Sequence, residues 1–252
     1  MEKVSGGWGR NYKTYGQKMK KVRIFLENFY QQLESDSELW QVYLPTSISQ
    51  TQGMLLRSLI EYFKPKSLLE IGCAYGLSML WIESAQHKLQ KHIVLDPFQN
   101  EFGYQGQKLV KKFKLSSIKK ILPEKSQIYL PKLIEKNEKI ECFFIDGSNL
   151  FDQVLSDLQC SFQILPVGGV MILRNTWNPS IFKAILFMLY NMPVRVWNLA
   201  IEDEKLFSSR DVFSRWLAKR RLRRYCRVEL LDFCVLVKVS EDNRKWNHFI
   251  DF

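Results

Sequence analysis

The sequence predicts an α/β fold in which a mostly parallel, doubly wound sheet of seven strands carries helices on both faces. Three observations favour this class. Short apolar segments alternate with helix-like segments between residues 67 and 191. These segments are apolar at nearly every position, as expected for parallel strands that are covered on both faces. A turn with two glycines follows the first of them, where an open parallel sheet binds its ligands.

The N-terminal part is predicted to be helical rather than alternating. Residues 1–16 are polar with glycine and aromatic residues and are expected to form a loose arm. Residues 16–33 and 51–63 have apolar positions at helical spacing, and Pro65 ends the second helix. We expect residues 1–50 to form an arm and a helical cap on a domain that spans residues 51–252.

The alternating region predicts five strands, each followed by a helix. The expected strands are residues 67–71, 92–96, 118–123, 141–146 and 168–174, and the expected helices are residues 76–86, 103–115, 129–136, 150–165 and 179–191.

The C-terminal part departs from this alternation. Residues 194–201 are a candidate strand, residues 208–227 a basic helical segment, and residues 228–239 a long apolar run. A last strand after such an excursion favours an antiparallel hairpin at the edge of the sheet. We interpret residues 201–227 as a basic insertion in the domain.

Composition narrows the class of protein. The net charge of +11 favours anionic partners, and the five cysteines contain no CxxC pair that would indicate a zinc site. No secretory signal opens the chain, and the most apolar long stretch is interrupted by Lys183, Pro193 and Arg195. We expect a cytoplasmic protein with reduced thiols and no transmembrane segment.

The glycine turn reads E-x-G-x-x-x-G, from Glu70 through Gly72 to Gly76. A dinucleotide site would need glycines where Ala74 and Leu77 stand, and a phosphate loop would need a G-K-[ST] sequence that is absent. A carboxylate is a poor neighbour for pyrophosphate but suits a ligand with a cationic end. This pattern favours S-adenosylmethionine, which carries an ammonium and a sulfonium group.

A second acid supports the same ligand. Asp96 ends the next predicted strand, 24 residues after Gly72, where a carboxylate can accept both hydroxyls of a ribose. The main alternative is an α/β domain that binds another nucleotide.

Several segments together resemble the seven-stranded, class I S-adenosylmethionine-dependent methyltransferases, and among them the catechol O-methyltransferase-like group. The segments are "TQGMLLRSL", "LLEIGCAYGLSML", "EKSQIYLPKL", "CFFIDGSNLFDQVLSDL" and "ILPVGGVMIL". The resemblance implies S-adenosylmethionine as cofactor. It places Ser78 at the start of the helix that follows the cofactor loop, Ser126 and Gln127 at the adenine, and Asp146 among the cofactor-binding residues.

The sequence departs from this group at the metal site. Metal-dependent members bind magnesium through an acid that corresponds to Asp146 and an Asp-Asn pair that here reads Arg174-Asn175. A guanidinium cannot bind a cation, so we predict that no metal is bound. The hypothesis for catalysis is that Asp146, Arg174 and Asn175 act on the acceptor, with Asp146 as the candidate base and Arg174 in the electrostatic place of the ion. The alternative role of Arg174 is an ion pair with Asp146.

Other candidate bases are weaker. Asn149 stands where many members of the group have a histidine, and His87, His92 and His248 are interpreted as structural or solvated. Asp146 is therefore the one candidate base, and the sequence does not establish that it acts as one.

The basic segment leaves the substrate class open. Between Arg215 and Arg227, seven of thirteen residues are Lys or Arg, and Trp216 and Tyr225 are interleaved. This pattern fits contact with a polyanion, but the favoured interpretation is a solvated helix face that covers the edge of the sheet. The leading hypothesis is O-methylation of a small molecule, such as a sugar or secondary metabolite, whose acceptor can be anionic. RNA methylation and cofactor binding without transfer are the alternatives, and a homodimer is left open.

Overall fold

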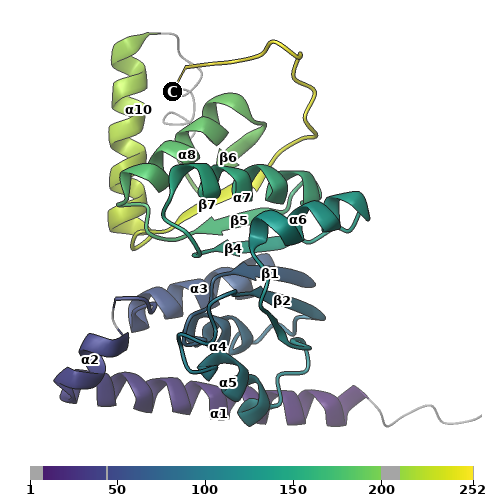
Figure 1. Ribbon diagram of the computed structural model, residues 1–252, viewed down its shortest axis with the longest axis vertical. Coiled ribbons are helices and arrows are strands. Elements are labelled where there is room, and N and C mark those ends of the chain that lie inside the picture. The colour runs from purple at the N-terminus through teal and green to yellow at the C-terminus, as the bar shows by residue number, and fades with distance from the viewer. Residues whose placement is uncertain (1–7, 44, 200–210, 252) are drawn as a thin grey trace, which may run out of the picture. The chain divides into compact units, whose positions relative to one another are not determined.

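The computed structural model describes residues 8–43, 45–199 and 211–251 of the chain (Figure 1). The chain divides into two compact units. The first unit comprises residues 1–66, 73–91 and 98–121, and the second comprises residues 67–72, 92–97 and 122–252. The second unit contains nearly all of the sheet, and each unit is described separately below.

The elements follow the predicted alternation. The helices are α1 (Trp8–Ser35), α2 (Ser37–Tyr43), α3 (Gln50–Phe63), α4 (Leu77–Glu83), α5 (Gln105–Phe113), α6 (Ser126–Glu135), α7 (Phe151–Ile164), α8 (Pro179–Asn191) and α10 (Val212–Arg224), which continues into a π-helical turn, η1 (Tyr225–Glu229). The strands are β1 (Ser67–Ile71), β2 (Lys91–Leu95), β3 (Ile121–Leu122), β4 (Cys142–Ile145), β5 (Val170–Leu173), β6 (Val194–Val196) and β7 (Cys234–Lys238).

The sheet has seven strands in the order β3-β2-β1-β4-β5-β7-β6. The pairs β1–β4 and β4–β5 are parallel, with Glu70 beside Phe144 and Ile145 beside Leu173. β7 runs antiparallel to both β5 and β6. The order reverses between β1 and β4, so the carboxyl ends of these two strands form the switch point at which open α/β sheets bind ligands.

The predicted fold class is confirmed, with two adjustments at the ends of the chain. The antiparallel strand β7 lies between β5 and β6, so β6 rather than the last strand forms the edge. The loose arm predicted for residues 1–16 is wrong from Trp8 onward, where α1 begins. Glycine lowers helix propensity there, but tertiary contacts of the helix override it. The short helix α2 was not predicted, and residues 201–210 of the predicted basic insertion lie outside the described residues.

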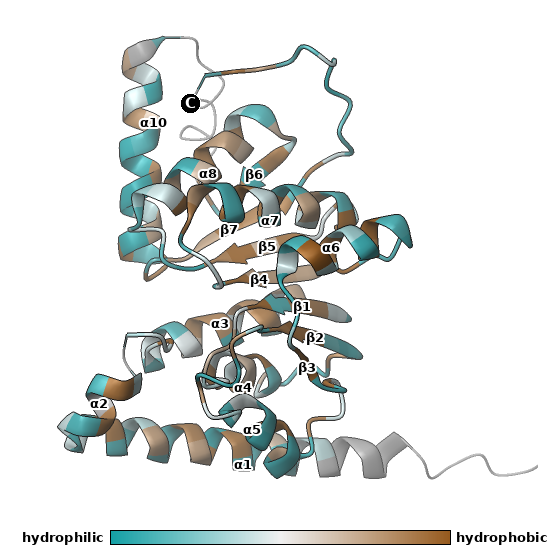
Figure 2. Cartoon of the chain, in the orientation of Figure 1, coloured by the Kyte–Doolittle hydropathy of each residue, from teal (hydrophilic) through white to brown (hydrophobic). Residues whose placement is uncertain are grey.

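The core of the second unit consists of its central strands. All four residues of β4 and all four of β5 are buried, which explains their unbroken apolar sequence. Phe143 and Phe144 on β4 have no exposed surface. Around these strands α6 packs on α7 and α7 on α8, and Figure 2 shows the brown, hydrophobic colour concentrated in the strands.

The first unit is built by α1 to α5. Ser49 and Gln52 form a reciprocal capping box that begins α3, and Lys64 ends that helix in the left-handed conformation, directly before Pro65. The packing of α3 on α4 depends on Gly53, because a Cβ at that position would lie 2.1 Å from the indole of Trp81.

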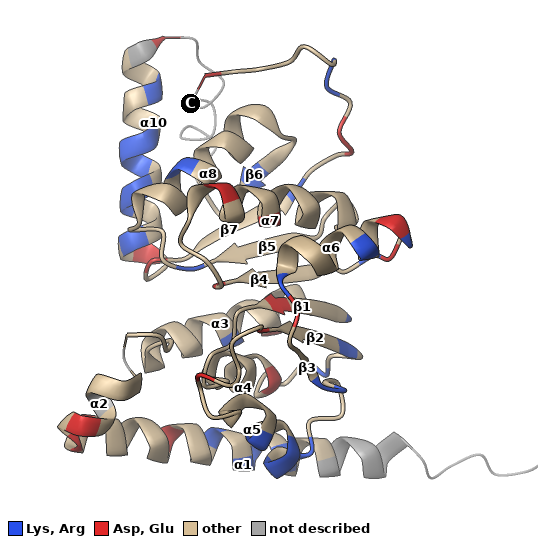
Figure 3. Ribbon diagram, in the orientation of Figure 1, with Lys and Arg blue, Asp and Glu red and all other residues tan. Residues whose placement is uncertain are grey.

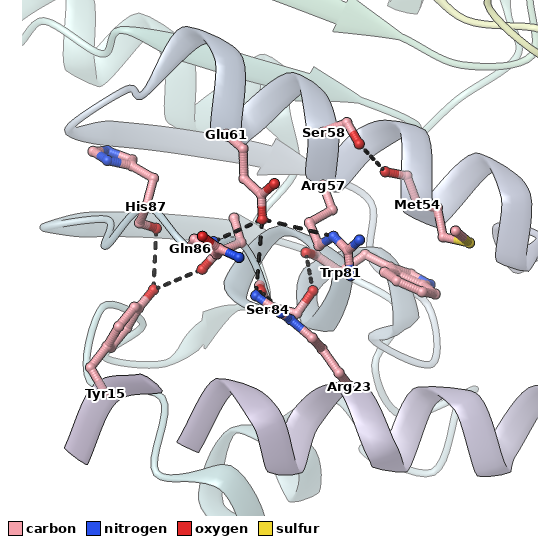
Figure 4. Close-up of polar contacts among 11 residues, drawn as sticks. Tyr15, Arg23, Met54, Arg57, Ser58, Glu61, Trp81, Ser84, Gln86 and His87 are labelled. Carbon is pink, nitrogen blue, oxygen red and sulfur yellow. Dashed lines mark hydrogen bonds and ion pairs between the residues drawn. The ribbon is translucent and has the colours of Figure 1, made fainter. Parts of the chain in front are cut away.

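Polar contacts join α1 and α3 to the turn after α4 (Figure 4). The hydroxyl of Tyr15 donates to the carbonyl oxygens of Ala85 and His87, at 3.3 and 3.2 Å. Arg23 donates to the carbonyl oxygen of Ser84 through Nε and Nη2, at 3.2 and 3.0 Å. Glu61 accepts the backbone N–H of Gln86 at 2.9 Å. The bonds of Tyr15 and Arg23 attach α1 to the turn after α4.

No helix within the described residues is long and apolar enough to cross a membrane.

Candidate functional site

Gly72 closes β1 in a position that only glycine can occupy. Its φ is +81°, and a Cβ would lie 2.6 Å from the carbonyl oxygen of Asp146 and 2.7 Å from the Cα of Gly147. Its N–H donates to the carbonyl oxygen of Leu95 at 2.8 Å. The ends of β1, β2 and β4 can therefore approach one another closely in the second unit, because Gly72 has no side chain.

The rest of the glycine turn belongs to the first unit. Gly76 precedes α4 with φ +85°, and its N–H donates to the carbonyl oxygen of Cys73 at 2.6 Å. A Cβ on Gly76 would lie 2.9 Å from the Cα of Gly106, at the start of α5. Ser78 lies in the first turn of α4 and is buried. This local geometry shapes a tight turn before the N-terminus of α4.

Gln99 supports this turn and was missed by sequence reasoning. Its side-chain amide donates to the carbonyl oxygen of Ala74 at 2.7 Å and to Sγ of Cys73 at 3.5 Å. Ala74 has a φ of +45°, an uncommon conformation for a residue with a side chain. No sequence signal marks Gln99, because its role depends on a turn 25 residues earlier.

Glu70 and His92 lie next to each other and are buried in the second unit. Oε2 of Glu70 lies 3.2 Å from Nε2 of His92, and neither side chain has exposed surface. Glu70 thus has a protein partner on the neighbouring strand, in agreement with the structural role expected for His92. The predicted contact of Glu70 with a ligand ammonium stays a prediction.

Asp96 follows β2 and is buried, with 4% of its surface exposed. Its N–H donates to the carbonyl oxygen of Leu122 at 3.0 Å, which fixes the backbone at the carboxyl end of the strand. The carboxylate therefore stands at the edge where β1, β2 and β4 end. Its predicted role on a ribose is not tested by this geometry.

The three residues predicted to act in catalysis lie in one cluster. Nη1 of Arg174 donates to Oδ2 of Asp146 at 2.6 Å, and Nδ2 of Asn175 donates to Oδ1 at 3.1 Å. Asn175 has a φ of +61°, which turns the chain after β5 toward β4. The register of β4 and β5 explains the meeting, because Ile145 is paired with Leu173 and the next residues follow side by side.

The electrostatics of this cluster favour a carboxylate that can exchange a proton. Burial raises the pKa of Asp146 to about 6, while Arg174 acts in the opposite direction through its charge and its hydrogen bond. The nearby charge of Glu70 contributes a further, smaller increase. Such a pKa is close to neutral pH, where a carboxylate is most useful as a general base.

Ser126 and Gln127 begin α6. Ser126 is buried, and its side chain forms a hydrogen bond with Asp157 of α7, whereas Gln127 is half-buried. Burial raises the pKa of Asp157 to about 6. Asp157 was not singled out in the sequence, because its position in a helical pattern resembles that of any polar residue.

The residues at the carboxyl ends of β4 and β5 do not fit the magnesium site that the resemblance implies. The guanidinium of Arg174 stands in one ligand position and is bound to Asp146. Within residues 8–43, 45–199 and 211–251, no group of three or more His, Cys, Asp or Glu side chains could hold a metal ion.

The comparisons with known proteins agree with this geometry. The family model described as a methyltransferase domain matches residues 69–176, which contain the last three residues of β1, the strands β2 to β5 and the Asp146 cluster. No curated protein matches the chain in sequence.

Solved structures resemble the fold at low sequence identity. The crystal structure of an O-methyltransferase from Bacillus cereus in complex with SAH is 15% identical with a TM-score of 0.50, covering 84% of this chain and 90% of that one. The crystal structure of cofactor-bound Rv0187 from MTB is 13% identical with a TM-score of 0.52, covering 88% and 91%. The chain therefore contains a region that matches a methyltransferase domain, within a seven-stranded sheet whose fold is similar to that of these solved structures.

Proposed function

We propose that this chain transfers a methyl group from S-adenosylmethionine to an oxygen atom of a small molecule, without a divalent metal ion. The observation that carries the proposal is the cluster of Asp146, Arg174 and Asn175 at the carboxyl ends of β4 and β5. It supplies a buried carboxylate and a fixed positive charge within the matched methyltransferase domain.

S-adenosylmethionine would supply a methyl group that its sulfonium already activates. The proposed contacts of the second unit are Asp96 on the ribose hydroxyls, Glu70 toward the ammonium, and Ser126 and Gln127 toward the adenine. The cofactor contacts predicted for Gly76 and Ser78, which belong to the first unit, stay predictions from the sequence. The SAH complex of the Bacillus cereus enzyme supports this ligand, because SAH is the product that remains after methyl transfer.

The chemistry needs alignment and removal of one proton. Asp146 accepts the proton of the acceptor hydroxyl, and Arg174 stabilises the negative charge that develops on the oxygen. The oxygen lone pair forms the new bond to the methyl carbon as the carbon–sulfur bond breaks, and the bonding electrons remain on sulfur. Asn175 keeps the carboxylate oriented. RNA methylation and cofactor binding without transfer are not favoured by any of the comparisons.

Calorimetric titration of the purified protein with S-adenosylmethionine and SAH tests the ligand. We expect Asp96→Asn to weaken binding at least ~10-fold, the cost of about one charge-assisted hydrogen bond. The matched control is Asp152→Asn, the same change at an exposed position of α7. Absence of binding by the unmodified protein would overturn the proposal.

Transfer of labelled methyl groups to a small-molecule extract, measured with and without EDTA, tests the reaction. We expect transfer to survive chelation. A rate that falls ~10-fold with EDTA and returns with magnesium would contradict the metal-independent mechanism while leaving the cofactor assignment intact.

A further inference from the structure

A groove of about 860 Å³ lies between α8 and α10 in the second unit. Its walls are Pro179, Phe182, Lys183 and Leu186 from α8 and Trp216, Lys219, Arg220, Arg223, Arg224, Arg227 and Val228 from α10 and η1. The volume falls within the ~300–1,000 Å³ that is typical of small-molecule sites. None of the residues that line the groove belongs to the Asp146 cluster.

The lining combines one sign of charge with an apolar floor. Six of the eleven lining residues are Lys or Arg, and no acidic residue is among them. Figure 3 shows this blue colour gathered along α10. Like charges around a concave surface repel one another, so an anion that enters the groove removes an existing electrostatic cost.

Two of the arginines are held in place by aromatic rings. The guanidinium of Arg223 lies 4.5 Å from the ring centroid of Phe182, across the groove on α8. The guanidinium of Arg220 lies 5.5 Å from the centroid of Trp216, one turn earlier on α10. Cation–π contacts restrict these long side chains while leaving their N–H groups available to bind an anion.

The beginning of α8 adds to this field. Pro179 and Phe182 belong to its first turn and line the groove, so the positive end of a thirteen-residue helix faces the same space. The partial positive charge of the helix N-terminus adds to that of the six cationic side chains that line the groove. A ligand with several negative charges would therefore match the positive charge of the groove.

We infer that the groove between α8 and α10 binds a small molecule that carries two or more phosphate groups. Phosphate matches the planar fork of arginine in geometry. Six of the positive charges line a groove whose floor is apolar and is formed by Phe182, Leu186 and Val228. A compact ligand with an apolar part fits this combination. The bound molecule thus has a compact phosphate part and an apolar or aromatic part. This inference does not depend on methyl transfer.

Calorimetric titration of the full chain with inorganic tripolyphosphate tests the phosphate part. The test variant is Arg220→Gln with Arg223→Gln, which removes both of the ring-held guanidinium groups. The matched control is Arg215→Gln with Arg221→Gln, which removes the same charge from α10 at positions that do not line the groove. We expect at least a 10-fold loss of affinity for the test variant and less than a threefold loss for the control.

Further measurements keep the result interpretable. Thermal unfolding of each variant reports whether it is folded. Arg220→Lys with Arg223→Lys should retain part of the affinity because it keeps the charge. Equal losses in the two variants, or no binding by the unmodified protein, would overturn the inference. So would a single-stranded RNA or an anionic lipid vesicle that binds far more tightly than tripolyphosphate and loses affinity equally in both variants.

Discussion

The guanidinium of Arg174 lies 2.6 Å from Oδ2 of Asp146 and joins the ends of two neighbouring parallel strands. Both side chains are about one-tenth exposed. A cation of the protein itself therefore balances the buried carboxylate at the carboxyl ends of β4 and β5. The consequences for catalysis and for stability can be separated by substitution.

Arg174→Gln should raise the pKa of Asp146 above its value of about 6, because burial continues to oppose the charged form while the opposing guanidinium is lost. If Asp146 is the base, the acidic limb of the pH–rate profile moves to higher pH, and the rate at pH 7 falls at least ~10-fold. The profile of kcat against pH measures this shift. An unchanged profile would show that Asp146 does not accept the proton.

The same substitution should also change how stability depends on pH. The pKa of Asp146 is raised on folding, so its contribution to stability is full below the unfolded value of 3.8 and declines as pH rises through about 6. In Arg174→Gln this decline extends to higher pH. We expect the free energy of unfolding at pH 8 to be lower than that of the unmodified protein by up to about 3 kcal/mol. Arg174→Lys is the control, because it keeps the charge and should retain most of the stability.

Gly72→Ala should destabilise the protein far more than Gly168→Ala. Both glycines have a φ above +80°, so both substitutions include the ~1–2 kcal/mol cost of a left-handed alanine. Only at Gly72 would the new Cβ meet backbone atoms, whereas at Gly168 nothing lies within 4 Å. We expect an additional loss of ~1–3 kcal/mol for Gly72→Ala in urea unfolding. Equal losses would mean that the ends of β1 and β4 separate easily.

The strands were predictable because their sequence reflects their burial. The expected range 67–71 is that of β1, and the expected range 179–191 is that of α8. The meeting of Asp146 with Arg174 and Asn175 was also foreseeable, because parallel strands bring their carboxyl ends to one edge. These features depend on local pattern and on the topology of the fold.

Other features depend on contacts that no local pattern encodes. The pairing of Glu70 with His92 requires the register of two strands, and the role of Gln99 requires the path of a distant turn. The start of α1 was missed because glycine and aromatic residues suggest a loop, whereas Tyr15 is held by the carbonyl groups of Ala85 and His87. The groove beside α10 requires the placement of two helices that are not adjacent in sequence.

Asp157→Asn should stabilise the protein at pH 8 but not at pH 4. Burial raises the pKa of Asp157 from 3.8 to about 6, so the wild-type protein loses stability from this group as pH rises through about 6. The neutral amide removes that loss, and we expect a gain of about 1–3 kcal/mol at pH 8. Thermal unfolding at both pH values measures it. Asp152→Asn, an exposed position of the same helix, should change stability by less than ~0.5 kcal/mol at either pH.

A stabilisation of equal size at both pH values would show that packing rather than charge determines the effect. A loss of stability at pH 8 would show instead that the bond between Ser126 and the ionised Asp157 outweighs the cost of burial.

The C-terminal tail should detach when Asn191 is replaced. Asn191 is the last residue of α8 and is 2% exposed. Its side-chain amide donates to the carbonyl oxygen of Ile250 at 2.8 Å and accepts the N–H of Ile250 at 2.7 Å. The pair of bonds imitates a step of β-pairing, so the side chain of Asn191 attaches the exposed tail to the end of α8. Asn191→Leu keeps the branched shape of the side chain and removes both bonds.

We expect Asn191→Leu to increase the rate of tryptic cleavage after Arg244 and Lys245 at least ~10-fold, because loss of the two bonds raises the population of the released tail by the equivalent of ~1.4 kcal/mol or more. Mass spectrometry of the early fragments measures this rate. Ile250→Ala is the control, since it keeps both backbone bonds and should change the rate less than about threefold. If the two variants are cleaved equally fast, the side chain of Ile250 rather than the amide of Asn191 holds the tail in place.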